Sequence, residues 1–103
     1  MIEITFLIPT ERNSDRAKHS PLLIEWFQGR LFDLFGGYTL AGEVDGAWVD
    51  QYGNVIRDKS HQYRVAVESN REPEVWDLLR EVKGQFDQQL IYAAVTSNHA
   101  HLV

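Results

Sequence analysis

The chain opens with an alternation of apolar and polar residues that is typical of a β-strand. Ile2, Ile4, Phe6 and Ile8 occupy every second position, and Pro9 follows them. A period of two places these side chains on one face of a sheet. The segment is therefore expected to form a strand that buries one face and ends at the proline.

Two later segments have the three- and four-residue spacing of amphipathic helices. Ser20-Pro21 is typical of an N-cap followed by proline at the first helical position, and Gly36-Gly37 is typical of a helix end. A second helix is expected to start near Glu72-Pro73. Their apolar positions are Leu22, Leu23, Trp26, Phe27, Leu31, Leu34 and Phe35 in the first helix and Val75, Leu78, Leu79, Val82 and Phe86 in the second. Each helix is expected to lie against a sheet.

The remaining strands are predicted between and after the helices. Tyr38-Thr39-Leu40 and Gly46-Ala47-Trp48-Val49 have strand-like composition, and a turn through Tyr52-Gly53-Asn54 leads into a second strand that ends at residues 63–68. After the second helix, residues 90–96 are expected to form a last long strand. A short extra strand at residues 100–103 is expected after the turn at Ser97-Asn98.

This order of elements predicts an α+β fold of the ferredoxin-like βαββαβ type, with two helices on one face of an antiparallel sheet. Residues 1–103 are expected to form a single domain. Helices on one face leave the other face open, and in a small domain an apolar second face is usually covered by a partner or a ligand. Leu7, Trp48 and Tyr92 are the candidates for that face. The strand register determines which residues lie there, because a shift of one residue exchanges the two faces. The one-sided cover predicts a homo-oligomer, in the simplest case a homodimer.

The central part of the chain, about residues 26–68, carries several glycine-centred motifs: Phe35-Gly36-Gly37-Tyr38-Thr39, Gly46-Ala47-Trp48, Gly53-Asn54-Val55-Ile56 and Asp58-Lys59-Ser60. In these motifs the chain resembles a group of small uncharacterised bacterial proteins, a domain of unknown function. The resemblance implies the two-helix α+β fold and no particular activity. Where that group leads us to expect a glutamate after the turn, this chain has Asp58-Lys59, so a shared carboxylate role does not carry over.

Composition narrows the classes of function. Of the 103 residues, 44% are hydrophobic and 12% aromatic, which is enough for one buried core. Ten basic and fifteen acidic residues give a formal charge of -5, so the overall field does not attract nucleic acid or anionic membranes. Cysteine is absent, which removes disulfides, thiolate metal ligands and thiol nucleophiles. The start of the chain lacks the pattern of a signal peptide, and a soluble cytoplasmic protein is expected.

The loop from Glu11 to His19 offers the clearest set of candidate binding residues. Arg12, Arg16, Lys18 and His19 could close over a phosphate or carboxylate, although a solvated charged loop explains the same residues. His61 could act as a general base, but it is more typical of a strand end. Trp48 could stack on a planar ligand, but packing against a helix or a subunit is favoured.

Other polar residues point to surface roles. His99 and His101 stand two apart near the end of the chain, and two histidines alone do not make a metal site, so no metal is expected. The acidic residues of the central hairpin are expected to form a solvated rim rather than a catalytic pair, because turns favour aspartate for conformational reasons. These are Glu43, Asp45, Asp50 and Asp58.

No catalytic constellation or cofactor motif is present, and no cofactor is expected. The preferred hypothesis is a non-enzymatic module that self-associates and acts in binding or regulation. The alternative is a small cofactor-independent enzyme, or a binder of a small anionic ligand, with a pocket between helices and sheet. A pocket that joins Trp48, His61 or Tyr63 to the Arg12–His19 loop would favour this alternative.

Overall fold

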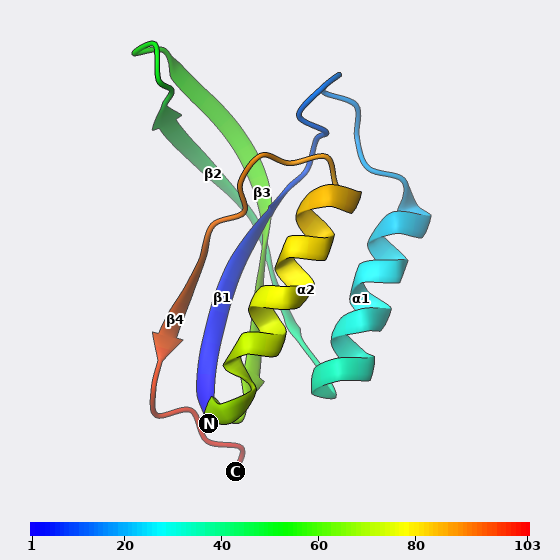
Figure 1. Cartoon of the computed structure of the whole chain (residues 1–103), viewed down its shortest axis with the longest axis vertical. Coiled ribbons are helices and arrows are strands. Elements are labelled where there is room, and N and C mark those ends of the chain that lie inside the picture. The colour runs from blue at the N-terminus through cyan, green and yellow to red at the C-terminus, as the bar shows by residue number, and fades with distance from the viewer.

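Four antiparallel strands form one sheet, and two helices cover one of its faces (Figure 1). The computed structural model describes all residues from 1 to 103. The elements are β1 (Ile2–Pro9), α1 (Pro21–Phe35), β2 (Thr39–Val49), β3 (Val55–Val67), a 3-10 turn (Ser69–Arg71), α2 (Glu72–Gln85) and β4 (Ala93–Ser97). In the sheet the strands lie in the order β2-β3-β1-β4. This arrangement confirms the predicted ferredoxin-like α+β fold.

The core lies between the helices and the two central strands. β1 and β3 are paired so that Phe6 is opposite Tyr63, and every second residue of each strand points toward the helices. The core side chains are Ile2, Ile4, Phe6, Ile8, Phe27, Leu31, Tyr63, Val65, Val67, Val75, Leu78, Leu79, Val82 and Phe86. The alternation at the start of the chain is therefore confirmed as the buried face of β1.

The end of the chain differs from the prediction. The last strand covers Ala93–Ser97 rather than residues 90–96, because the chain first passes along the loop that follows β1. There the Gln88 side chain donates to the carbonyl oxygen of Glu11 at 2.7 Å. The expected strand at residues 100–103 is wrong. That segment makes one backbone hydrogen bond, from Ala100 to Met1 at 3.2 Å, and finds no strand partner.

The sheet face away from the helices is more polar than expected. Thr5 lies opposite Arg64 in the sheet, and its hydroxyl oxygen is 2.9 Å from that of Thr96 on β4. Of the three apolar candidates for this face, Leu7 is half-buried there and Tyr92 is exposed in the segment before β4. Trp48 lies on β2 opposite Ile56. Exposed apolar side chains therefore lie on the hairpin and around β4 rather than on the two central strands.

A bulge in β2 sets the direction of the hairpin side chains. Leu40 is opposite Tyr63, but the next pair is Glu43 with His61, so β2 contains one residue more than β3 over this stretch. Gly42 has a φ of 98°, a left-handed conformation that glycine adopts without strain. Beyond the bulge, Glu43 shares the helix-facing side with His61, and Trp48 lies on the opposite side.

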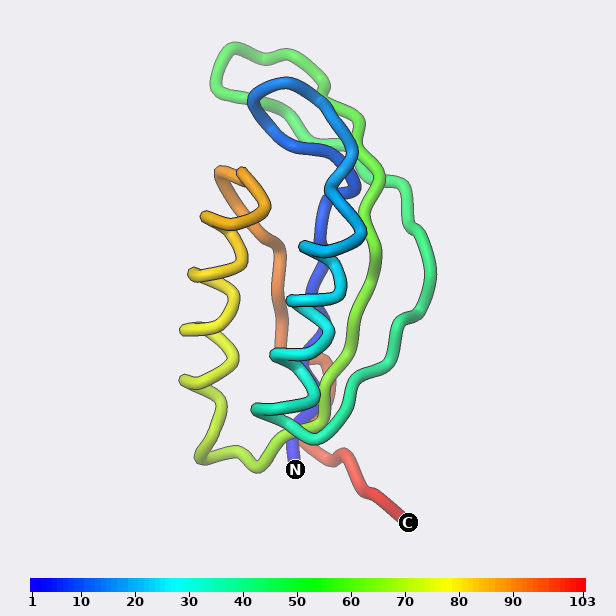
Figure 2. The backbone as a smooth tube through the Cα atoms, turned by 90° about the vertical axis from the view of Figure 1, so that its right-hand side faces the viewer, coloured from blue at the N-terminus to red at the C-terminus, as the bar shows by residue number.

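The far half of the β2–β3 hairpin projects beyond the helices (Figure 2). A compact domain of this length has a radius of gyration of about 13 Å, whereas this chain has one of 14.1 Å. The hairpin turn is fixed by Asp50, whose carboxylate accepts hydrogen bonds from the backbone N–H groups of Asn54 and Tyr52, both at 2.9 Å. These hydrogen bonds lower the pKa of Asp50, and the one from the Asn54 backbone has the largest effect. Asp50 is therefore a turn residue.

Two glycines of α1 are expected to respond to alanine in opposite directions. Gly36 ends the helix at φ 79°, where a side chain costs about 1 kcal/mol or more, so Gly36→Ala should destabilise the protein by that amount. Gly29 lies inside the helix, and no atom lies within 4 Å of the position that a Cβ would take, so Gly29→Ala should stabilise by up to about 1 kcal/mol. Urea unfolding of both variants measures the difference. Equal effects on the two midpoints would contradict the assigned helix end.

Candidate functional site

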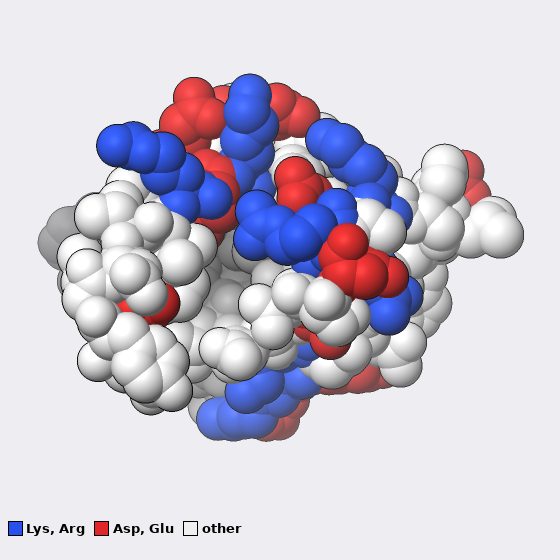
Figure 3. Space-filling view, turned by 90° about the horizontal axis from the view of Figure 1, so that it is seen from above, with Lys and Arg blue, Asp and Glu red and all other residues white.

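A pocket of about 230 Å³ lies where the loop after β1 crosses the end of the sheet. It is lined by Ile8, Pro9, Thr10, Lys18, His19, Ile24, Glu43, His61, Tyr63 and Phe86. Seen from this end, the molecule has a hollow with basic and acidic side chains along part of its border and other residues along the rest (Figure 3). Four of the seven residues singled out in the sequence, Lys18, His19, His61 and Tyr63, therefore share one cavity.

His19 is held at the wall of the pocket by contacts with Pro9 and Phe86. Its Nε2 atom donates a hydrogen bond to the carbonyl oxygen of Pro9 at 2.9 Å, since a carbonyl can only accept. Its ring lies 4.7 Å from the ring of Phe86 in an edge arrangement. Burial lowers the pKa of His19 and outweighs the hydrogen bond to Pro9, which acts in the opposite direction. Its Nδ1 atom is the ring nitrogen that remains to meet a ligand.

His61 faces Glu43 across the two strands of the hairpin. The His61 Nε2 atom lies 3.5 Å from the Glu43 Oε1 atom, which becomes an ion pair when the imidazole is protonated. The bulge at Gly42 creates this contact, because it brings Glu43 onto the helix-facing side of β2. The pair thus places an imidazole and a carboxylate side by side at the pocket.

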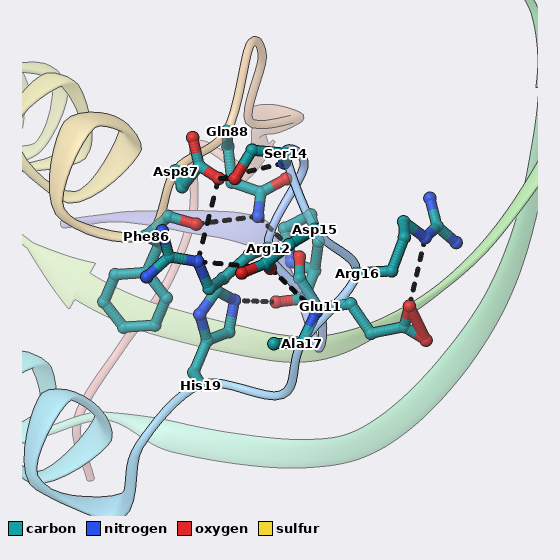
Figure 4. A network of polar contacts seen from close by, with 11 residues as sticks. Glu11, Arg12, Ser14, Asp15, Arg16, Ala17, His19, Phe86, Asp87 and Gln88 are labelled. Atoms are coloured by element: carbon teal, nitrogen blue, oxygen red, sulfur yellow. Dashed lines mark hydrogen bonds and ion pairs between the residues drawn. The ribbon is translucent and has the colours of Figure 1, made fainter.

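The four basic residues of the loop do not act as one set in this structure. Lys18 lines the pocket and makes no ion pair, and the loop bends back so that Glu11 and Lys18 form a β-bridge. Arg12 and Arg16 do not line the pocket. The Arg12 Nε atom is 3.4 Å from the Asp15 Oδ1 atom, and the Arg16 Nε atom is 3.1 Å from the Glu11 Oε2 atom (Figure 4). Their charges are therefore satisfied within the loop.

Asp87, which sequence reasoning did not single out, anchors this loop to the end of α2 (Figure 4). Its Oδ2 atom accepts hydrogen bonds from the Ser14 backbone N–H at 2.9 Å and from the Ser14 hydroxyl at 2.5 Å. Arg12 Nε lies 3.9 Å from the same oxygen. The backbone of Asp87 has a φ of 52°, which aspartate tolerates better than most residues. An aspartate just after the apolar period of a helix is the sequence signal that could have found it.

Asp87→Asn is expected to loosen the loop, and acid should do the same in the parent protein. The hydrogen bonds from Ser14 lower the pKa of Asp87 below its ordinary value of 3.8. A lowered folded-state pKa means that this anchoring is complete above the ordinary value and is lost as the pH falls through the lower one. Hydrogen exchange of the Ser14 amide measures both effects. Asp77→Asn, on the exposed side of α2, is the matched control, and equal Ser14 exchange in the two variants would contradict the anchor.

Tyr63 belongs to the core more than to the pocket. Its ring is stacked on Phe6 with centroids 5.7 Å apart, and its hydroxyl accepts a hydrogen bond from the Gln28 Nε2 atom at 3.1 Å. Burial raises the pKa of Tyr63. A phenol with a raised pKa is a poor proton donor at neutral pH. Tyr63 therefore contributes its ring to the lining of the pocket rather than a proton.

Trp48 lies outside the pocket and outside the core between helices and sheet, so of the two packing partners predicted for it, a helix or a subunit, only the subunit stays a prediction. It lies on the projecting part of β2 and is half exposed, because the hairpin extends past the ends of both helices. His99 and His101 are exposed beyond β4. The structure contains no group of three or more His, Cys, Asp or Glu residues arranged to hold a metal ion. None of its helices has the length and apolar character needed to cross a membrane.

No family model matches the chain, and no curated protein matches it. Solved structures match the chain in backbone arrangement. The periplasmic divalent cation tolerance protein CutA from Archaeoglobus fulgidus aligns over 99% of this chain and 88% of its own, with a TM-score of 0.69 and 14% identity. The divalent cation tolerance protein Cut A1 from Thermus thermophilus aligns over 97% and 88%, with a TM-score of 0.61 and 16% identity.

A phage SAM lyase in complex with S-methyl-5'-thioadenosine is also similar in structure. It aligns over 96% of this chain and 92% of its own, with a TM-score of 0.59 and 10% identity. Proteins described by such different names share this backbone arrangement. At these identities the likeness shows the fold alone.

Proposed function

We propose that this protein is a non-enzymatic binding or regulatory module that self-associates through its β2–β3 hairpin. The observation that carries the proposal is the exposed apolar surface on the part of the hairpin beyond the helices. Trp48, Val49, Tyr52 and Val55 there are 48%, 64%, 79% and 60% exposed. Trp48 lies on one side of the hairpin, and the paired Val49 and Val55 lie on the other, so both sides of its end present apolar surface. Exposed apolar surface of this kind is typical of a region that another protein covers.

The edge of β2 supports a second copy of this chain as the occupant. β2 pairs only with β3, so the backbone groups of its outer edge are free to pair with another strand. A standard interface buries about 800 Å² on each partner, which is about one eighth of the 6726 Å² surface of this chain. A projecting hairpin with exposed aromatic residues offers an area of that order without rearrangement of the core.

Charge favours pairing of the hairpins near their ends. If two β2 strands paired about Val44, Glu43 of one copy would face Asp45 of the other, and like charges directly opposite are destabilising. Pairing about Trp48 would instead place Ala47 opposite Val49. We therefore propose a homodimer in which the apolar ends of the hairpins meet.

Sedimentation velocity between about 1 μM and 1 mM protein tests self-association directly, because the assembled fraction follows mass action. The expected species has twice the mass of the 11.9 kDa chain. A single monomeric species over the whole range would overturn the proposal. A larger closed assembly would keep self-association but replace the dimer, because β2 would then pair with the other free edge, β4.

We further propose that the chain forms one domain, that it acts in the cytoplasm, and that it belongs with the small bacterial proteins that share its glycine-centred motifs. The motifs at Gly36-Gly37, Gly46 and Gly53 support this grouping. Cell fractionation tests the location. Recovery in a periplasmic extract would contradict it.

A further inference from the structure

We infer that the pocket between His19 and His61 binds a small organic carboxylate and that a proton is taken up with it. The inference is independent of self-association, because none of the apolar residues at the hairpin end lines the pocket. It rests on the cavity itself, on Lys18, which makes no ion pair, and on the imidazoles of His19 and His61, which line the same cavity.

Lys18, whose side chain is exposed, supplies a positive charge to the lining of the pocket. It makes no ion pair, whereas Arg12 and Arg16 on the same loop are paired with carboxylates. The Glu43 carboxylate also lines the pocket and balances Lys18, so the cavity is close to neutral when both imidazoles are neutral. Each protonated imidazole then adds one positive charge, and an anion gains from each addition.

The groups around His19 determine when its imidazole becomes charged. His19 is exposed to the charges of Arg12, Asp87 and His61, and it has Lys18 beside it in the chain. Burial, Arg12 and His61 all oppose its charged form, whereas Asp87 favours it. An anion placed between the imidazoles would offset the burial of His19 and its repulsion from Arg12 and His61, because it supplies an opposite charge beside that ring. Binding and protonation therefore support each other.

The apolar lining decides the class of anion. Ile8, Ile24 and Phe86 form walls that offer no hydrogen bonds and suit a short hydrocarbon body. The volume of about 230 Å³ corresponds to about seven or eight water molecules of the bulk liquid. A carboxylate head at Lys18 and the imidazoles, with a body of a few carbons against these walls, fits the chemistry better than a fully polar ion.

The test uses sodium butyrate as the probe and follows the ring signals of His19 and His61 by NMR on the full chain. At pH about 6 we expect saturable shifts of both rings, with a Kd about tenfold lower than at pH about 7.5, as linkage to one proton requires. Butyramide, which has nearly the same shape and no charge, should cause no saturable shift.

Matched variants separate the pocket from general charge effects. Lys18→Gln should raise the butyrate Kd at least about fivefold, whereas Lys83→Gln on α2 removes the same charge away from the pocket and should leave it unchanged. His61→Gln removes one of the two imidazoles that line the pocket and should raise the butyrate Kd. Equal effects of the two lysine variants, or equal binding of butyramide, would overturn the inference. Tighter binding of inorganic phosphate than of butyrate would overturn the organic part of it.

Discussion

Tyr63→Ala is expected to lower the free energy of unfolding by about 3–5 kcal/mol, the range typical of a large aromatic residue removed from a core. Tyr63 is 2% exposed. Its ring centroid lies 5.1 Å from that of Phe27 on α1 and 5.7 Å from that of Phe6 on β1. The side chain therefore joins the sheet to a helix, and alanine would leave a cavity between three elements.

Two further variants show whether the ring or the hydroxyl carries this effect. Tyr63→Phe keeps the packing and removes the acceptor of the Gln28 hydrogen bond, so it should cost only about 1 kcal/mol. Tyr52→Ala removes an aromatic side chain that is 79% exposed and should leave the monomer's stability nearly unchanged. Urea unfolding measures all three. A loss below about 1 kcal/mol for Tyr63→Ala would contradict its place in the core.

Trp48→Asp is expected to raise the dissociation constant of the self-associated form by at least about 30-fold, the effect of losing one interfacial aromatic hot spot. The substitution puts a charge where the proposed interface is apolar, and in a two-fold dimer both copies carry it. Because Trp48 is half exposed and lies outside the core, the folded monomer should persist. Sedimentation measures assembly, and circular dichroism on the same samples measures folding.

Tyr92→Asp is the matched control for this experiment. Tyr92 is also an exposed aromatic residue, but it precedes β4 and is remote in sequence from the hairpin. Its substitution should leave the dissociation constant unchanged. Equal weakening by both variants would indicate a general charge effect, and an unfolded Trp48→Asp variant would contradict the exposed position of the tryptophan.

The helices and β1 could be predicted because their signals are local. Ser20 accepts a hydrogen bond from the Leu23 backbone N–H at 3.2 Å and so begins α1, as the Ser-Pro pair predicts. The alternation of Ile2, Ile4, Phe6 and Ile8 depends only on neighbouring residues. By contrast, the face on which Trp48 lies depends on one extra residue near Gly42, and one residue of shift exchanges the two faces of a strand.

The candidate site could be predicted in part for a similar reason. The sequence places four basic residues in one loop, but it does not reveal which of them already have partners. The nearest partner of Arg12 is Asp15 and that of Arg16 is Glu11, and the same loop places these carboxylates within a few residues of Lys18 as well. Only the folded arrangement distinguishes these arginines from Lys18, which has no partner.

The bulge at Gly42 lets one strand serve two separate tasks. Residues on the core side of the bulge follow one alternation, and residues beyond it follow the opposite one. Glu43 and Trp48 both lie beyond the bulge, so the extra residue near Gly42 determines the side of the sheet to which each of them belongs. Loss of that one residue would turn Glu43 away from the pocket and turn Trp48 over at the same time, so the two surfaces of this small protein depend on the same backbone irregularity.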